Sequence, residues 1–167
     1  MQIHHTITNK ENQVFKIIYN DVDDDMTFAG KKIESVRAYC FYQDKLVIVH
    51  ESAGHWGIPG GGIDEGESAE NGIIREVIEE ANMKIVKMRS VGMHETIRPS
   101  GVSAFHARVV CLVEPIADFQ EDPAGEVTEI KLIDPKEFIP LCDSQWGEMA
   151  DRMLERALQF KEEMKLG

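Results

Sequence analysis

The chain has 167 residues, of which 43% are hydrophobic and 29% charged, and its formal net charge is −12. This length and composition favour one globular domain spanning residues 1–167, and they argue against a disordered chain. The negative charge disfavours stable nucleic-acid binding, which needs basic patches to neutralise phosphates. A small phosphorylated ligand stays compatible with it, provided that metal ions bridge the two negative partners.

The cysteines and the chain start indicate where the protein works. Cys40, Cys111 and Cys142 are widely spread and form no CxxC pair, so we expect reduced thiols and neither a disulfide framework nor a zinc site. The start MQIHHTITNK lacks the apolar segment of a signal peptide. No run approaches the ~18 apolar residues of a membrane span. We therefore expect a cytoplasmic protein that does not bind membranes.

Residues 1–32 are predicted to be an N-terminal extension with one strand, in the run QVFKIIYND, followed by the acidic turn DVDDDM. An EF-hand loop starting at Asp21 would need Gly at its sixth position and Glu at its twelfth. Met26 and Lys32 stand there instead, so we interpret the acidic run as a solvated turn. The extension could serve dimerisation or act as a lid, and both a monomer and a homodimer remain open.

The predicted core, residues 33–142, begins with SVRAYCFYQDKLVIVHES, which indicates two strands around a turn at 43–45. GHWGIPGGGIDEGES follows and is predicted to be a loop because it is rich in Gly and Pro. SAENGIIREVIEEANM then predicts a helix, with Ser68 as its N-cap and Asn82 as its left-handed end. An apolar stripe at helical spacing comprises Ile73, Ile74, Val77, Ile78 and Ala81.

Three strands are predicted after this helix, in KIVKMRSVGMHETI, VSAFHARVVCLVEPI and VTEIKLI. DPKEFIPL begins a helix, with Asp134 as cap and Pro135 at the first helical position. The last unit, residues 143–167, is predicted to be a terminal helix from 144 to 165. Its apolar face is expected to pack on the core, or alternatively to form a dimer surface; it contains Trp146, Met149, Met153, Ala157, Phe160 and Met164. The element order predicts an α/β (α+β) sandwich with a mixed sheet between helices.

Three carboxylates crowd the predicted first helix. Glu76, Glu79 and Glu80 fall on the side away from the apolar stripe at ~100° per residue, where like charges repel. The glycines at 60–62 precede the helix and let backbone oxygens approach a ligand. Oxygen ligands suit hard cations such as Mg²⁺ or Mn²⁺, which bind through carboxylates and substrate phosphates. These residues therefore indicate a metal-assisted reaction on a phosphate compound.

Residues 61–83, GGIDEGESAENGIIREVIEEANM, resemble the Nudix box, whose pattern is G-x5-E-x7-R-E-U-x-E-E-x-G-U with U a bulky apolar residue. Asn82 departs from the pattern, because Gly is usual there. Asn also tolerates the left-handed conformation, so we expect a small effect on stability and no loss of chemistry. The segments before the box, LVIVHES and HWGIPGGG, are similar to the strand and to the W-x-x-P-G-G sequence that precede the box in the family. The fitting positions are Gly61, Glu67, Arg75, Glu76, Val77, Glu79, Glu80 and Met83.

The resemblance implies a MutT-like hydrolase with an α/β/α sandwich fold and the box as loop–helix–loop. It implies Mg²⁺-dependent cleavage of the pyrophosphate of a nucleoside diphosphate linked to another group. Glu79 and Glu80 match metal ligands, with the Gly60 carbonyl as backbone ligand. Glu76 matches a residue that binds metal or serves as general base. Arg75 matches the residue that orients the carboxylates, with Glu67 as its partner, and the implied catalytic set is Glu67, Arg75, Glu76 and Glu79.

Candidates for substrate contacts lie outside the box. Trp56 could stack on a base or pack beneath its loop, and Arg98 could meet a phosphate or stay solvated. Some members of the family use a further acid from a later loop as base or ligand. Glu121, Asp122 and Glu126 stand in that region, although a solvated loop is the simpler interpretation.

The substrate is less determined than the family. Three histidines could contact the substrate, namely His55, His94 and His106, but a lone histidine on a strand is more often structural. Pro99 in TIRPSG is similar to a proline of ADP-ribose-cleaving members of the family. The near-minimal length favours a nucleoside triphosphate. ADP-ribose, a nucleotide sugar and a dinucleoside polyphosphate are alternatives. A domain that senses a nucleotide without cleaving it is another, although such domains typically lose box carboxylates.

Overall fold

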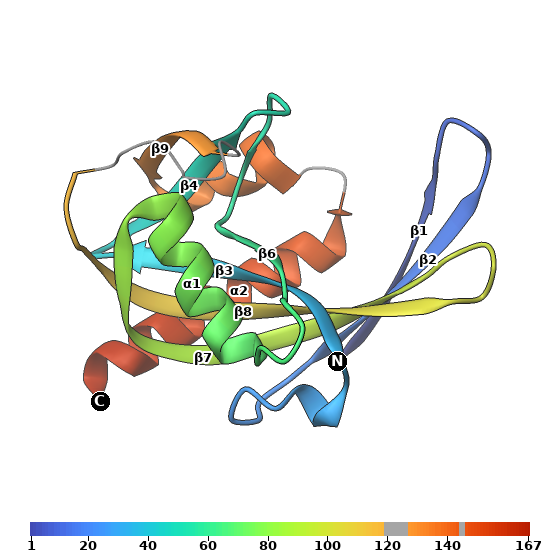
Figure 1. Cartoon of the computed structure of the whole chain (residues 1–167), viewed down its shortest axis with the longest axis horizontal. Helices are drawn as coiled ribbons and strands as arrows, with labels where there is room; N and C mark the ends of the chain where they lie inside the picture. Colours follow the sequence, from blue (N-terminus) through green and yellow to red (C-terminus); the bar gives the residue numbers. More distant parts are fainter. Residues whose placement is uncertain (119–126, 144–145) are drawn as a thin grey trace.

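A computed structural model describes residues 1–118, 127–143 and 146–167. The described residues form one mixed sheet, with α1 (Ala69–Ala81) on one face and α2 (Glu148–Leu166) on the other (Figure 1). The hydrophobic core has the same two halves. Ile73 and Val77 of α1 pack in one cluster, and Met149 and Met153 of α2 pack in the other. The predicted α/β/α sandwich is confirmed.

The sheet contains nine strands within the described part of the chain, in the order β1-β2-β7-β8-β3-β4-β5, with β6 also paired to β3 and β9 to β4. The β3–β8 pair is parallel and the others are antiparallel. The strands are β1 (Gln2–Thr8), β2 (Val14–Asp21), β3 (Ile33–Tyr42), β4 (Lys45–Glu51), β5 (Trp56–Gly57), β6 (Gly60–Gly62), β7 (Met83–Ile97), β8 (Ser103–Pro115) and β9 (Val127–Ile133). Short helical turns are η1 (Phe28–Gly30), η2 (Pro135–Glu137) and η3 (Ile139–Asp143).

An arm extends from the sheet beyond the two helices and consists of β1, β2 and the adjoining ends of β7 and β8 (Figure 1). The prediction of a single strand in residues 1–32 was wrong, because β1 also pairs with β2 along its length. β1 carries few apolar side chains, so its own sequence signals a strand weakly. Its backbone hydrogen bonds to β2 define it, and β2 in turn pairs with β7.

The stretch that precedes α1 was predicted to be a loop, but it contains β5 and β6. β6 consists of three glycines, which have a low intrinsic strand propensity. It forms because its backbone pairs with β3, with Gly61 opposite Val36 and Gly60 opposite Arg37. This pairing fixes the glycine backbone beside α1.

Helix α1 has the predicted ends. The Ser68 side chain accepts a hydrogen bond from the Asn71 amide, and Asn82 is left-handed, with φ 56° and ψ 38°. The predicted faces are partly wrong, because Ile78 is 44% exposed whereas Glu76 and Glu80 are 8% and 4% exposed. The reason is that α1 contacts β6 in addition to β3 and β7, so its buried surface is wider than one apolar stripe.

In the C-terminal part, the structure agrees more closely with the prediction. Asp134 caps η2 in a capping box with Glu137, although the helical segment there is only a 3-10 turn followed by a π turn. The terminal helix begins later than the predicted residue 144, because Gly147 has a non-helical backbone (φ 52°, ψ −128°), so Trp146 precedes α2. The α2 face packs in the core as predicted, because Met149, Met153 and Phe160 are buried. The three cysteines are free.

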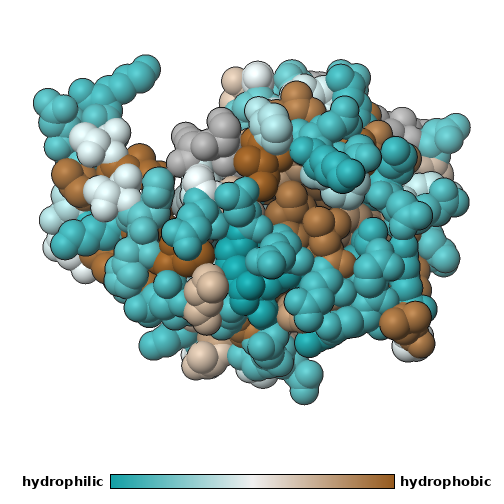
Figure 2. All heavy atoms as spheres, turned by 180° about the vertical axis from the view of Figure 1, so that it is seen from behind, coloured by the Kyte–Doolittle hydropathy of each residue, from teal (hydrophilic) through white to brown (hydrophobic). Residues whose placement is uncertain are grey.

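The side opposite to the view of Figure 1 has a mostly hydrophilic surface, in keeping with the net charge of −12, and a hydrophobic patch lies on the main body (Figure 2). Among the residues described, no helix is both long enough and apolar enough to cross a membrane.

Candidate active site

Arg75 holds the box carboxylates together. Its Nε and Nη2 donate to Glu67 Oε2 and Oε1, both at 2.9 Å. Its Nη1 donates to Glu76 Oε1 at 3.0 Å and to Glu79 Oε2 at 3.3 Å. Nη2 also donates to the Gly62 carbonyl at 3.1 Å. One guanidinium therefore balances three carboxylates and ties α1 to the glycine strand.

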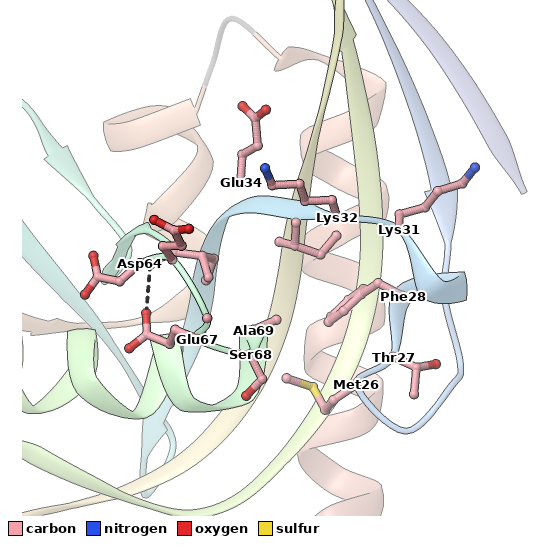
Figure 3. A pocket seen from close by; sticks show the side chains of 14 residues that line it. Met26, Thr27, Phe28, Lys31, Lys32, Glu34, Asp64, Glu67, Ser68 and Ala69 are labelled. Carbon is pink, nitrogen blue, oxygen red and sulfur yellow. Dashed lines mark hydrogen bonds between the residues drawn. The ribbon is translucent and has the colours of Figure 1, made fainter.

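Glu67 links the box loop to the helix. Its Oε1 also accepts a hydrogen bond from the Asp64 amide at 3.1 Å, drawn as the dashed line in Figure 3. The hydrogen bonds from Arg75 and Asp64 lower the Glu67 pKa to about 2. The Glu67 bonds in turn raise the pKa of Arg75. Glu67 is thus ionised throughout the physiological range and fixes the position of Arg75.

Glu76 and Glu80 are buried acids at the same place. Burial raises the pKa of Glu80 to about 8, the nearby Glu76 charge adds to this, and the Gly60 amide that donates to Glu80 Oε2 at 3.0 Å opposes it. Burial also raises the pKa of Glu76, against the hydrogen bond from Arg75. Two adjacent buried carboxylates ionise together only where positive charge compensates them.

The glycines before α1 allow this close packing. At Gly60, φ is +152°, and a Cβ atom would lie 2.2 Å from the Val36 carbonyl oxygen. At Gly61, a Cβ atom would lie 2.6 Å from Glu76 Oε1. A side chain at position 60 would collide with the backbone of β3, so glycine is required there. A side chain at position 61 would displace the Glu76 carboxylate.

The donor set fits a hard divalent cation in chemistry and charge, because every candidate ligand is an oxygen. The arrangement is not a preformed cage, since no three acidic, histidine or cysteine side chains in the described ranges are placed to hold a metal together. Arg75 engages Glu76 and Glu79, while Glu80 accepts from the Gly60 amide. A metal would therefore compete with these hydrogen bonds, and the carboxylates would turn toward it.

The substrate-contact candidates are distributed differently. Trp56 borders a hollow together with Arg37 and Glu51, and none of the box carboxylates borders that hollow. Arg98 lies with Pro99 beside a separate hollow of the arm. The structure does not bring Arg98 together with the box. Glu126 lies outside the described residues, as do Glu121 and Asp122.

The three histidines lie in two places. His55 Nε2 is 2.8 Å from Glu51 Oε2 at the edge of the site. His94 and His106 lie opposite each other on β7 and β8, with ring centroids 4.9 Å apart. Burial lowers the pKa of both rings. The latter two belong to the packing of the sheet, as expected for histidines on strands.

Two further charged residues belong to the site although the box does not contain them. Arg37 and Glu51 border a hollow of about 300 Å³ together with Gly60, Gly61 and Glu80. Arg37 Nη1 donates to Glu51 Oε1 at 3.3 Å and to the Ile58 carbonyl at 3.0 Å. The sequence signal that could have indicated Arg37 is that it is a charged residue within the apolar strand run SVRAYCFY.

A larger hollow of about 680 Å³ lies between η1 and the start of α1 (Figure 3). Its border includes Phe28, Lys31 and Lys32 on one side and Asp64 and Glu67 on the other. It shares Glu67 with the network around Arg75, but the three helical carboxylates do not border it. Size alone therefore does not locate the site.

Comparison with known proteins decides the family. The NUDIX domain family matches residues 31–155, which is most of the chain. The chain belongs to the Nudix family. This assignment makes the protein a Nudix hydrolase, a pyrophosphohydrolase by class, and the box at residues 61–83 lies within the matched region.

Solved structures agree with this Nudix fold. The Bacillus subtilis pyrophosphohydrolase BsRppH has a TM-score of 0.68 at 14% identity, covering 93% of this chain and 96% of its own. A NUDIX hydrolase from Nitrosomonas europaea has a TM-score of 0.61 at 20% identity, covering 78% and 91%. The NUDIX domain of Shewanella oneidensis NrtR, complexed with ADP ribose, has a TM-score of 0.57 at 23% identity, covering 75% and 88%. At these identities the likeness concerns the fold.

Proposed function

We propose that this Nudix hydrolase cleaves, with Mg²⁺, the pyrophosphate of a nucleoside diphosphate linked to another group. The observation that carries the proposal is that Arg75 holds Glu67, Glu76 and Glu79 together, while Glu80 of the same helix accepts a hydrogen bond from Gly60 of the glycine strand. Mn²⁺ would serve the same ligands.

The residues have the following roles in the proposal. Glu76, Glu79 and Glu80 hold the metal together with the Gly60 carbonyl. A bound divalent ion supplies an acidified water and shields phosphate charge in the transition state. Glu76 is alternatively the base that accepts the proton of the attacking water.

Arg75 and Glu67 act on these carboxylates and not on the substrate. The fork of hydrogen bonds between them limits where Arg75 Nη1 lies, and this atom contacts both Glu76 and Glu79. They position the ligands, so their loss would disorder the site without removing a metal-binding oxygen of the helix.

The substrate proposed first is a nucleoside triphosphate. ADP-ribose or a nucleotide sugar is the alternative, since a Nudix domain with the same fold is complexed with ADP ribose. All three kinds of compound place a pyrophosphate next to a nucleoside, so the same carboxylates would serve each of them.

The test is a product assay with Mg²⁺ against triphosphates, ADP-ribose, nucleotide sugars and dinucleoside polyphosphates. Glu79→Gln should keep the fold and lower turnover by orders of magnitude. Glu70→Gln is the matched control, because Glu70 lies exposed in the first turn of the same helix. Wild-type rates in Glu79→Gln would refute the proposed role, and binding of a nucleotide with no product from any compound would favour a sensing domain.

A further inference from the structure

A hollow of about 280 Å³ lies on the α2 side of the sheet and shares Arg37 and Glu51 with the hollow that Glu80 borders. Its border contains four aromatic side chains. Tyr39 and Phe138 are buried and meet edge to face, with ring centroids 5.7 Å apart. Trp56 and Trp146 are half-buried. The hollow therefore has buried rings beneath it and two indoles that remain partly open to solvent.

This aromatic hollow and the hollow beside Glu80 are neighbours, because Arg37 and Glu51 border both. Arg37 stands on β3 directly opposite Gly60 of the glycine strand. A diphosphate bound at the carboxylates would thus lie next to Arg37. The group attached to that diphosphate would extend past Arg37 toward Trp56 and Trp146.

Contacts with the sheet position both indoles. The Trp56 ring lies 4.8 Å from the His50 ring, and Lys131 Nζ stands 4.4 Å from its centroid. The Trp146 ring lies 5.6 Å from His94 and 6.2 Å from His5. Rings held in this way lose little conformational freedom when a flat ligand stacks on them.

We propose that the aromatic hollow binds the base of the substrate by stacking on Trp56 and Trp146, with Arg37 between the base and the cleaved pyrophosphate. The inference rests on the proposed function for the position of the pyrophosphate. Stacking accepts any base, because every base has a π-face. The enzyme should therefore separate compounds with a base from those without one, and should discriminate weakly among bases.

The test uses the fact that the chain contains two tryptophans, both at this hollow. The probe is α,β-methylene-ADP with Mg²⁺, which carries a base and a non-cleavable bridge. Methylenediphosphonate is the matched control, since it has the same metal-binding bridge and no nucleoside. We expect saturable quenching of tryptophan fluorescence by the first ligand and none by the second. Equal quenching by both ligands, or none by either, would overturn the proposal.

Variants assign the effect to each ring. Trp146→Leu and Trp56→Leu should bind α,β-methylene-ADP about tenfold to a hundredfold more weakly in a calorimetric titration. The corresponding Phe variants keep a ring and should lose less. Methylenediphosphonate should bind all four variants as it binds the wild type, which also shows that they fold. Unchanged nucleotide affinity in both Leu variants would refute the assignment.

The two proposals fail separately. Base-dependent quenching without hydrolysis of any compound would keep the base site and refute the proposed reaction. Hydrolysis that responds to Glu79→Gln but has the same KM in wild type and both Leu variants would keep the reaction and refute the base site.

Discussion

Arg75 and Glu67 are joined by two parallel hydrogen bonds, from Nε to Oε2 and from Nη2 to Oε1, each 2.9 Å long. The remaining guanidinium nitrogen, Nη1, contacts Glu76 and Glu79. The planar fork of Arg75 therefore serves one carboxylate with two nitrogens and two others with the third. A lysine offers a single point charge and cannot reproduce this arrangement.

Arg75→Lys should therefore keep the charge and lose activity. We expect kcat to fall about 10- to 100-fold, the range typical of residues that orient metal ligands. Glu67→Gln should act in the same direction, because it weakens the same fork. Metal-dependent turnover would be measured beside a circular dichroism spectrum, with Lys84→Arg, an exposed change outside the site, as control. Full activity in Arg75→Lys would contradict a positioning role for the fork.

Glu80→Gln should separate metal binding from stability. Burial raises the Glu80 pKa to about 8, so the metal-free wild type loses stability as pH rises from the ordinary value of 4.5 through about 8. Gln keeps an oxygen for the Gly60 amide and does not ionise. We expect the metal-free variant to be at least as stable as wild type at about pH 9.

Thermal unfolding with and without Mg²⁺ tests whether Glu80 binds the metal. At a Mg²⁺ concentration near 100 times the dissociation constant, binding would stabilise the wild type by about 2.7 kcal/mol. Glu80→Gln should lose most of that gain. An equal Mg²⁺-induced shift in both proteins would exclude Glu80 as a ligand.

Gly60→Ala and Gly61→Ala should fail in different ways. A Cβ atom at Gly60 meets the backbone of Val36 and Arg37, which cannot move without breaking the β3–β6 pairing. We therefore expect Gly60→Ala to lose several kcal/mol of unfolding free energy, more than the ~1–3 kcal/mol that a strained residue alone costs. A Cβ atom at Gly61 meets the carboxylate of Glu76. Gly61→Ala should fold and lose activity because that carboxylate is displaced. Denaturant unfolding and turnover distinguish them, and an active Gly61→Ala would show that Glu76 moves at no cost.

His94 should make stability depend on pH. Burial first, and then the charges of Arg108 and His106, lower its pKa well below 6.5 in the folded protein. The unfolded chain binds a proton near pH 6.5, so folding stability is lost as pH falls below that value. His94→Phe keeps the ring and does not titrate. The difference in unfolding free energy between wild type and variant should shift by about 1.4 kcal/mol between about pH 7.5 and about pH 5.5, and a constant difference would contradict this account.

Local sequence explains the parts of the fold that depend on neighbours along the chain. Ser68 and Asn82 end α1 as predicted, and Asp134 caps the turn after β9, because each acts on a backbone within a few residues. The spacing within the box is also local, since a helix brings Glu79 next to Arg75, four residues before it, and next to Glu76, three residues before it. The single domain, the cytoplasmic location and the choice between monomer and homodimer stay predictions.

Pairing across the sheet decided what local spacing could not. β1 and the three-glycine strand β6 have weak propensities of their own and exist because β2 and β3 pair with them. The β3–β6 pairing also places Arg37 opposite Gly60, although these two residues are far apart in the sequence, and Glu80 is buried beside this strand pair.

The sequence by itself therefore determined the family, the fold class and the residues that meet on one helix. Only the tertiary structure decided which carboxylates are buried and that Trp56 and Trp146 border one hollow beside them. The physical reason is range: caps and helix faces depend on backbone geometry over a few residues, whereas burial and the walls of a hollow depend on which distant strands pair.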